Sequence, residues 1–204
     1  RRAPVVTCQS HCMDMIISIG KYAPKLVRGL HFRRSDASTF SRAIITAIVV
    51  TGLSTELTLE DCKFVGFDRA LSLQRVTTKL VLKQLEFIRN VAPSNNGDDL
   101  GGGAILIDSC SDVSLSRSTF EANQALSSSN GRALDGGALS IYSTTSSSTV
   151  SMTDCWTESN VATGRGGAVF VGRTSSFFMS STKMNHDAAN EGGALAAFAA
   201  TIVV

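Results

Sequence analysis

The hydrophobic and polar positions of this chain recur in a fixed order. The pattern has eight positions. The first and third are apolar, the fourth and fifth are polar, the sixth is small or apolar, the eighth is large, and any residue can occupy the second and seventh. Five copies occupy residues 57–64, 80–87, 113–120, 150–157 and 177–184. A weaker copy contains Val27, Leu30 and Phe32, with Lys25 where the first apolar residue would stand. A unit repeated at this length predicts a repeat architecture.

The phase of this pattern predicts two short strands in each copy. Its first and third positions alternate as in a strand with one buried face, and so do its sixth and eighth, but on the opposite parity. One flat strand cannot bury both sets, because a shift of one residue turns every side chain to the other face. The residues between the sets are polar throughout: Glu60 and Asp61, Lys83 and Gln84, Ser116 and Arg117, Thr153 and Asp154, and Ser180 and Ser181. We therefore expect a bend at a solvated corner.

A Gly-Gly-Ala triplet precedes a third apolar run in four units. The triplets are Gly102, Gly103 and Ala104; Gly136, Gly137 and Ala138; Gly166, Gly167 and Ala168; and Gly192, Gly193 and Ala194. A phosphate-binding glycine loop would be followed by a helix, whereas a strand-like run follows each of these triplets. We expect the glycines to permit a bend or a close approach of backbone where a side chain would not fit.

An Asn or Asp stands three residues after the large position in four units, and Phe67 stands there in the first. These residues are Asn90, Asn123, Asn160 and Asp187. Such side chains tolerate the left-handed conformation and bond to nearby backbone, so they suit a tight turn. A metal or sugar contact is the alternative interpretation. A ladder of side-chain amides bonded to one another and to turn backbone is favoured over it.

Each unit is therefore strand, corner, strand, Asn turn, loop, Gly-Gly and strand. No unit contains a convincing amphipathic helix, which argues against leucine-rich or ankyrin solenoids, and a single Trp does not suit a propeller. The prediction is an all-β parallel β-helix with three short strands per turn and about five to six turns. We assign 25–204 to it, truncated at the C-terminal end, and 1–24 to an irregular segment or the start of the solenoid. Both ends look like cuts in a longer chain.

Equivalent side chains of successive turns should form ladders inside this helix. The expected ladders are Leu57/Leu80/Val113/Val150/Phe177, Leu59/Leu82/Leu115/Met152/Met179 and Phe64/Phe87/Phe120/Thr157/Met184. On the outward parity of the third strand, Leu106, Phe170 and Phe198 should form an apolar stripe that marks a contact surface or lies under a covering loop. Leu100 and Leu134 flank the loops that could cover it.

Composition narrows the possible functions. An apolar fraction of 43% in 204 residues is too high for a disordered chain. A net charge of +2 is too small to imply a nucleic-acid partner. No apolar run reaches the ~18 residues of a membrane-spanning helix, so none is expected in this segment.

The five cysteines predict no reactive or metal site. Cys8 and Cys12 could pair or bind a metal, but no His or second Cys pair stands at zinc-site spacing. Cys62 and Cys155 occupy the same interior position three units apart, beyond the reach of a disulfide, and should be buried as small apolar residues. Cys110 lies at a corner and is expected to be partly exposed. We predict no catalytic residue, cofactor or metal ligand.

The pair of motifs Gly-Gly-Ala-[Ile/Leu/Val] and Phe-x-x-Asn, the second literal at 87–90 and 120–123, resembles the repeats of the chlamydial polymorphic outer membrane protein family. The resemblance covers about residues 57–199, and more weakly 25–56. It implies a right-handed parallel β-helix that is secreted or exposed at the cell surface or outer membrane and acts in adhesion, with a protein or glycan on another surface as partner. Thr157 and Met184 replace the Phe, Asp187 replaces the Asn, Asp68-Arg69-Ala70 replaces one triplet, and the family's translocation barrel is absent.

Two other functions compete with adhesion. Polysaccharide lyases and hydrolases also use parallel β-helices, and they need paired carboxylates or acidic calcium ligands beside a basic residue. The candidates are Asp61, Asp154 and Arg117 at equivalent corners and the loop pair 98–99, but Asp61 and Asp154 are three units apart, too far to act together. The third possibility is an architectural spacer within a larger surface protein.

Overall fold

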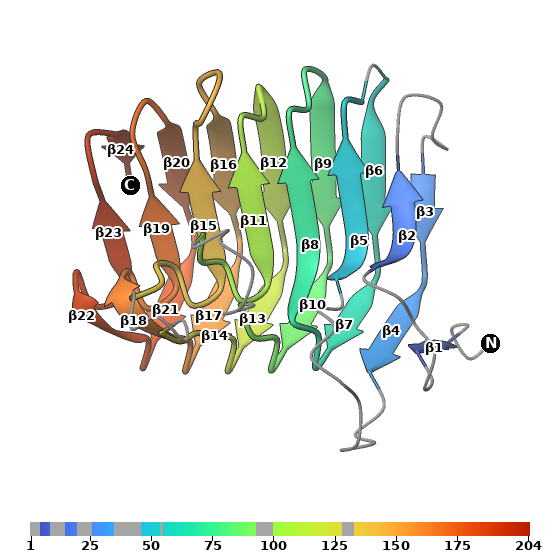
Figure 1. The fold of residues 1–204 in the computed structure, drawn as a ribbon, viewed down its shortest axis with the longest axis horizontal. Helices are drawn as coiled ribbons and strands as arrows, with labels where there is room; N and C mark the ends of the chain where they lie inside the picture. Colours follow the sequence, from blue (N-terminus) through green and yellow to red (C-terminus); the bar gives the residue numbers. More distant parts are fainter. Residues whose placement is uncertain are drawn as a thin grey trace.

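The structure is a computed structural model that describes residues 5–8, 15–19, 26–34, 46–53, 55–92, 100–127 and 133–204. Every regular element in these ranges is a β-strand, so the all-β prediction is confirmed for them. The chain advances along the long axis of the molecule from its N-terminus to its C-terminus (Figure 1).

Most of the strands belong to three sheets of seven parallel strands each. Sheet A contains β1 (Val5–Cys8), β4 (His31–Arg34), β7 (Lys63–Val65), β10 (Glu86–Ile88), β13 (Thr119–Glu121), β17 (Trp156–Glu158) and β21 (Lys183–Asn185). Sheet B contains β2 (Met15–Ile19), β5 (Thr46–Thr51), β8 (Arg69–Gln74), β11 (Ile105–Asp108), β15 (Leu139–Tyr142), β19 (Val169–Val171) and β23 (Leu195–Ala197). Sheet C contains β3 (Leu26–Arg28), β6 (Leu57–Glu60), β9 (Lys79–Lys83), β12 (Asp112–Ser116), β16 (Thr149–Thr153), β20 (Ser176–Ser180) and β24 (Thr201–Val203).

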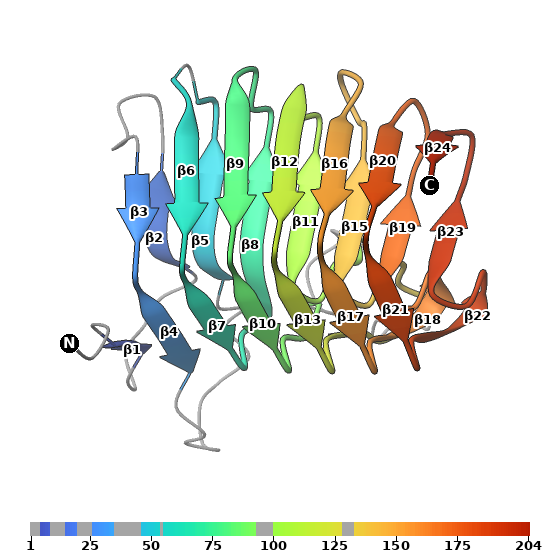
Figure 2. The same cartoon turned by 180° about the vertical axis from the view of Figure 1, so that it is seen from behind.

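The chain visits sheets A, B and C in rotation, so each sheet is extended by one strand per circuit. Sheets B and C stand face to face, and sheet A lies along one end of both (Figures 1 and 2). This arrangement of parallel strands is consistent with a parallel β-helix or solenoid. Seven strands per sheet in the described ranges exceed the expected five to six turns. The difference arises because β1 and β2, within residues 1–24, pair with β4 and β5.

The repeat pattern places its large apolar residues in the interior in the expected register. Leu57, Leu80, Val113, Val150 and Phe177 are paired in sequence across sheet C, and all are buried. In sheet A the rings of Phe32, Phe64, Phe87 and Phe120 stack with centroids 5.0, 5.1 and 4.9 Å apart. The Phe stack extends the ladder predicted from the pattern by one residue, because the weak copy at 26–34 adopts the same register.

The expected bends lie at the second polar residue of each corner. Asp61, Gln84, Arg117, Asp154 and Ser181 all have positive φ, between 48° and 55°. The Asn turn differs from the expectation, because the left-handed residue is the one before each Asn or Asp. These residues are Arg89, Ala122, Ser159 and His186. The Asn side chains are therefore selected for their hydrogen bonds and not for their own backbone conformation.

A fourth, short sheet lies where a loop was expected after the Asn turn. Sheet D contains β14 (Gln124–Ala125), β18 (Val161–Arg165) and β22 (Ala188–Glu191). It carries a second small core of Ala92, Ala125 and Ala162 under Leu134. Leu134 is thus buried in this core, which corrects the prediction that it covers the outer stripe.

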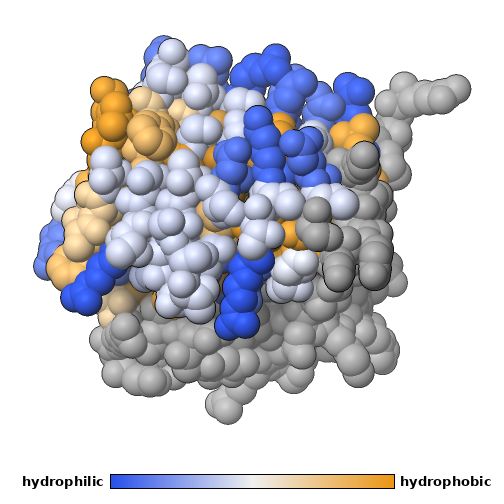
Figure 3. Space-filling model, turned by 90° about the horizontal axis from the view of Figure 1, so that it is seen from above, coloured by the Kyte–Doolittle hydropathy of each residue, from blue (hydrophilic) through white to orange (hydrophobic). Residues whose placement is uncertain are grey.

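Hydrophobic residues gather on the surface at the end of the stack that carries β23 and β24 (Figure 3). Phe198, Val203 and Val204 are exposed there by 43%, 51% and 79%. Interior positions of the last circuit, such as Leu195 and Ile202, are only partly buried, because no described strand packs on their far side.

Candidate functional site

The two glycines of each triplet have different steric roles. The first has positive φ, between 64° and 81° at Gly102, Gly136, Gly166 and Gly192. The second glycine of the first three triplets, at Gly103, Gly137 and Gly167, lies against the backbone of neighbouring circuits. A Cβ on Gly137 would be 2.1 Å from the Gly167 carbonyl oxygen and 2.7 Å from the Val161 nitrogen. The triplets therefore turn the chain from sheet D into sheet B at a point where backbones almost touch.

The side-chain amides of the Asn turns form a continuous buried ladder. The Nδ2 atoms of Asn90 and Asn123 donate to the Oδ1 atoms of Asn123 and Asn160, each at 2.9 Å, and Asn160 donates to Asp187 at 2.8 Å. Each Oδ1 also accepts the backbone N–H of the preceding ladder residue. Phe67, the exception in this position, donates its own N–H to Asn90 Oδ1 at 3.0 Å. These side chains are fully occupied by the fold.

Two departures from the repeat compensate for each other. The Asp187 side chain has no N–H to donate. Its second carboxylate oxygen accepts a hydrogen bond from the hydroxyl of Thr157, which lies in the neighbouring strand of sheet A. Thr157 stands where the repeat otherwise has Phe, so the Asp and the Thr occur together. The triplet replacement is also explained, since Arg69 is in register with Gly103 and its guanidinium donates to the Leu100 and Gly101 carbonyls.

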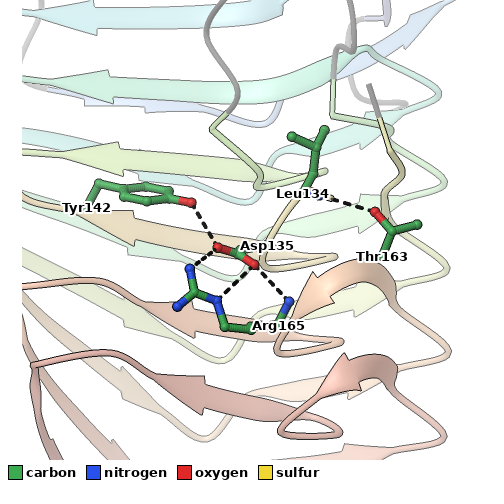
Figure 4. Close-up of polar contacts among 5 residues, drawn as sticks. All are labelled: Leu134, Asp135, Tyr142, Thr163 and Arg165. Atoms are coloured by element: carbon green, nitrogen blue, oxygen red, sulfur yellow. Dashed lines mark hydrogen bonds and ion pairs between the residues drawn. The ribbon is translucent and has the colours of Figure 1, made fainter. Parts of the chain in front are cut away.

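The candidate site lies where the chain passes from the strands of sheet D to those of sheet B (Figure 4). Asp135, which precedes the second triplet, is 8% exposed. Its carboxylate accepts Nη2 of Arg165 at 2.7 Å, Nε at 3.3 Å and the Arg165 backbone N–H at 2.8 Å. Tyr142 Oη donates to the same carboxylate at 3.4 Å. A Cβ on Gly164 would be 2.3 Å from this carboxylate, so a glycine at 164 leaves room for it.

A charge signal before the triplets could have identified this cluster from the sequence. Asp135, Arg165 and Glu191 each directly precede a Gly-Gly-Ala triplet on consecutive circuits, and Arg165 pairs in register with Glu191. Stacking therefore places a positive charge between two negative ones. The pKa of Arg165 is raised, mainly by its hydrogen bond with Asp135.

Two cavities adjoin on either side of Arg165 and Tyr142. The polar cavity, of about 380 Å³, is lined by Asp135, Thr163, Asn190 and Glu191 among others. The aromatic cavity, of about 220 Å³, is lined by Phe170, Phe198 and Arg173 together with Ser143 and Thr144.

The rings and guanidiniums of the aromatic cavity contact one another. The Arg165 guanidinium carbon lies 4.4 Å from the Phe170 ring centroid and 5.2 Å from that of Phe198, and Arg173 lies 4.8 Å from Phe198. Tyr142 covers Phe170 at 5.4 Å between ring centroids. These cation–π contacts hold both guanidiniums at the cavity.

The outer apolar stripe exists only in part. Leu106 and Phe170 lie in one outward row of sheet B, separated by Ser140, but they are 2% and 1% exposed. Phe170 is covered by Tyr142 and Arg165 instead of the predicted Leu134. Phe198 follows the end of β23 and is the exposed member. Instead of the predicted apolar stripe, this face carries one exposed ring, that of Phe198, beside the guanidiniums of Arg165 and Arg173.

The electrostatics of the cluster favour binding over proton transfer. Burial, followed by the negative charge of Asp135, raises the pKa of Tyr142 to about 12. A phenol with that pKa stays protonated at neutral pH, so it is a poor general base. The Asp135 carboxylate accepts hydrogen bonds from Arg165 and Tyr142 and thereby positions the guanidinium.

We expect this raised pKa to make part of the stability pH-dependent. Because folding favours the protonated phenol, the contribution is complete below pH 10, the ordinary tyrosine value, and is lost as pH rises from 10 towards 12. Urea titrations from about pH 9 to pH 12 should show a steeper loss of unfolding free energy in the wild type than in Tyr142→Phe. Parallel curves would contradict this assignment.

The acidic residues weighed for an enzyme are not assembled into one centre. Asp61 and Asp154 occupy the same corner position on different circuits. Arg117 lies on the circuit next to that of Asp154, and both residues line an open cavity of about 370 Å³ together with Trp156. Residues 98–99 lie outside the described residues. No group of three His, Cys, Asp or Glu side chains in the described ranges is placed to hold a metal ion.

Cys62, Cys110 and Cys155 are buried free thiols. Cys62 and Cys155 are 2% and 3% exposed, as expected. Cys110 is 0% exposed, which corrects the prediction of partial exposure, since the corner after β11 turns its side chain inward. Burial raises the pKa of both Cys110 and Cys155 to about 11.

Both thiols should resist alkylation in the folded protein. At pH 8 a thiol with a pKa of about 11 is only about 0.1% thiolate, and burial blocks access as well. Iodoacetamide should label the Cys110 and Cys155 peptides at least ~100-fold more slowly in buffer than in denaturant. Equal rates in the two solvents would show that these thiols are accessible.

A second exposed aromatic lies on another face. Trp156, the single tryptophan of the chain, is 47% exposed on the outer side of sheet A, beside Thr119 and Lys183 in register. In the part of the chain that the structure describes, no helix has the length and apolar character needed to span a bilayer.

Comparison with protein-family models, curated proteins and solved structures found no match for this chain, so its function has to be argued from its own residues.

Proposed function

We propose that this chain is a right-handed parallel β-helix, secreted or displayed at a cell surface or outer membrane, that binds a protein or glycan of another surface without catalysis. The fold supports this proposal, since three stacked parallel sheets give a rigid, elongated body with broad outer faces. Solenoids use such extended surfaces to bind partners. The resemblance to the chlamydial repeat family supports adhesion and the location.

The observation that carries the proposal is the Arg165 cluster. Its carboxylate accepts hydrogen bonds from both the Arg165 guanidinium and the Tyr142 phenol, while Phe198 and Arg173 face solvent beside it. Arginine and aromatic side chains are the residues that contribute most to binding at protein surfaces. The cluster thus offers anchoring groups and no group poised to move a proton.

Attachment of the purified protein to cultured cells and to immobilised extracellular matrix tests this function. Protein-coated beads should attach saturably, and soluble protein should compete. A spacer role, the architectural alternative, would leave attachment at the level of uncoated beads.

A polysaccharide-cleaving enzyme is the second candidate, because Asp135, Glu191, Arg165 and Tyr142 line one cavity. This alternative expects new reducing ends when polysaccharides are incubated with the protein, and their loss in Asp135→Asn. The binding proposal expects no new reducing ends with either protein.

A further inference from the structure

The two cavities that meet at Arg165 differ in the chemistry they offer to a ligand. The hydroxyls of the aromatic cavity are already bonded within the protein: Ser143 with Ser175 at 2.8 Å, and Thr144 with Asp108 at 2.8 Å. Recognition in the aromatic cavity is therefore left to the exposed Phe198 ring and to the two guanidiniums.

Arg173 supplies uncompensated positive charge to the aromatic cavity. Arg165 is paired with Asp135, whereas Arg173 makes no ion pair with any described residue, and its guanidinium lies over the Phe198 ring. Two of the Arg165 nitrogens are bound to Asp135, which leaves Nη1 without a partner among the described residues. A carboxylate is the group that matches such planar donors.

The polar cavity offers hydrogen-bond acceptors. The Glu191 carboxylate makes no hydrogen bond to a described group. Asn190 Nδ2 donates to the Thr163 carbonyl oxygen, which leaves the Asn190 Oδ1 as an acceptor for a ligand. An acceptor-rich, negatively charged wall suits a ligand with hydroxyl donors and repels a second carboxylate.

We propose that the two cavities bind consecutive rings of an acidic oligosaccharide, with a carboxylated ring in the aromatic cavity and an uncharged, hydroxyl-rich ring in the polar cavity. The aromatic cavity, at about 220 Å³, is smaller than the ~300–1,000 Å³ of drug-sized sites and suits one ring. The C–H groups of a sugar ring pack on the negative faces of aromatic rings.

A peptide strand does not fit this place. Strand addition requires a free sheet edge, whereas β15 and β19, which lie beneath the cavities, pair with a strand on each side. The outer edge of β23, at the end of the stack, pairs with no described strand. The inference rests on the proposed binding function and names the ligand class of that same surface.

Calorimetric titration of the protein with three hexasaccharides at fixed ionic strength tests the inference. Hyaluronan alternates carboxylated and neutral rings, polygalacturonate is charged at every ring, and chitohexaose is neutral. Hyaluronan should bind at least ~10-fold more tightly than the other two. Arg173→Gln and Phe198→Ala should each weaken its binding at least ~10-fold, and Glu191→Gln should raise affinity for polygalacturonate.

Lys79→Gln, on sheet C, and Trp156→Ala, on sheet A, are the matched controls and should bind hyaluronan like the wild type. Arg173 and Phe198, the residues replaced in the two variants expected to lose binding, are both exposed. Circular dichroism checks that each variant is folded. Equal binding of hyaluronan and polygalacturonate, an unchanged Arg173→Gln, or equal binding of hexaglutamate overturns the inference. If no saccharide binds but coated beads still attach to cells, the inference fails alone; if neither occurs, the proposed function fails too.

Discussion

Replacing Asn123 by leucine is expected to lower the free energy of unfolding by at least about 4 kcal/mol. Asn123 is fully buried and accepts two hydrogen bonds from Asn90, and it donates to Asn160 Oδ1 at 2.9 Å and to the Phe87 carbonyl at 3.1 Å. Leucine has similar bulk but breaks all four hydrogen bonds, and each buried group that loses a partner costs about 1–3 kcal/mol. Asn160 Oδ1 keeps the backbone N–H of residue 123, and Asn90 Nδ2 keeps the Phe64 carbonyl, so the expected loss lies at the lower end of that range for each bond. Urea denaturation followed by circular dichroism measures the loss.

Asp187→Asn is the control for the Asn123 variant. An amide at 187 keeps the oxygen that accepts from Asn160, so the change should be within about 1 kcal/mol. Comparable losses in the two variants would mean that the ladder contributes little and that any change at the turn is equally harmful.

Replacing Gly137 by alanine is expected to be at least as damaging as overpacking a core, at or above the ~3 kcal/mol upper end of that range. The added Cβ would lie 2.1 Å from the Gly167 oxygen and 2.7 Å from both the nitrogen and oxygen of Val161, all of them backbone atoms. Backbone in a hydrogen-bonded ladder cannot move aside as a side chain can, so neighbouring circuits must separate.

Gly193→Ala is the comparison within the same motif. It is also the second glycine of a triplet, but nothing lies within 4 Å of its added Cβ. Its φ of +51° should cost about 1–2 kcal/mol for alanine. Thermal and urea unfolding should therefore rank the variants as wild type, Gly193→Ala, Gly137→Ala. The reverse order would refute the close-approach account of the triplets.

The repeat pattern predicted the strands of sheets A, B and C because large residues at fixed positions must stack in register. The opposite parities around Asp61 and its equivalents required a bend, and a bend is present. Sheet D was not predictable in the same way. Its strands are short and carry alanine on their buried side, as at Ala125 and Ala162, so alternation gives almost no hydrophobic contrast.

The candidate site was missed for a different reason. The predictions made from the sequence do not include Asp135 or Arg165, although their shared place before a triplet puts them side by side on adjacent circuits. The cover over Phe170 depends on that ion pair, which holds the guanidinium 4.4 Å from the ring. Stacking converts a sequence offset into a contact, so positions compared across repeats are more informative than any single loop.

The proposed non-catalytic binding and the proposed acidic-saccharide site together imply that this chain binds an acidic polysaccharide and leaves it intact. The most direct measurement incubates fluorescently labelled hyaluronan with the immobilised protein, then determines both the amount retained and the length of the retained chains. We expect saturable retention of full-length chains, reduced at least ~10-fold by Arg173→Gln. Retention unaffected by Arg173→Gln, or recovery of shortened chains, would contradict it.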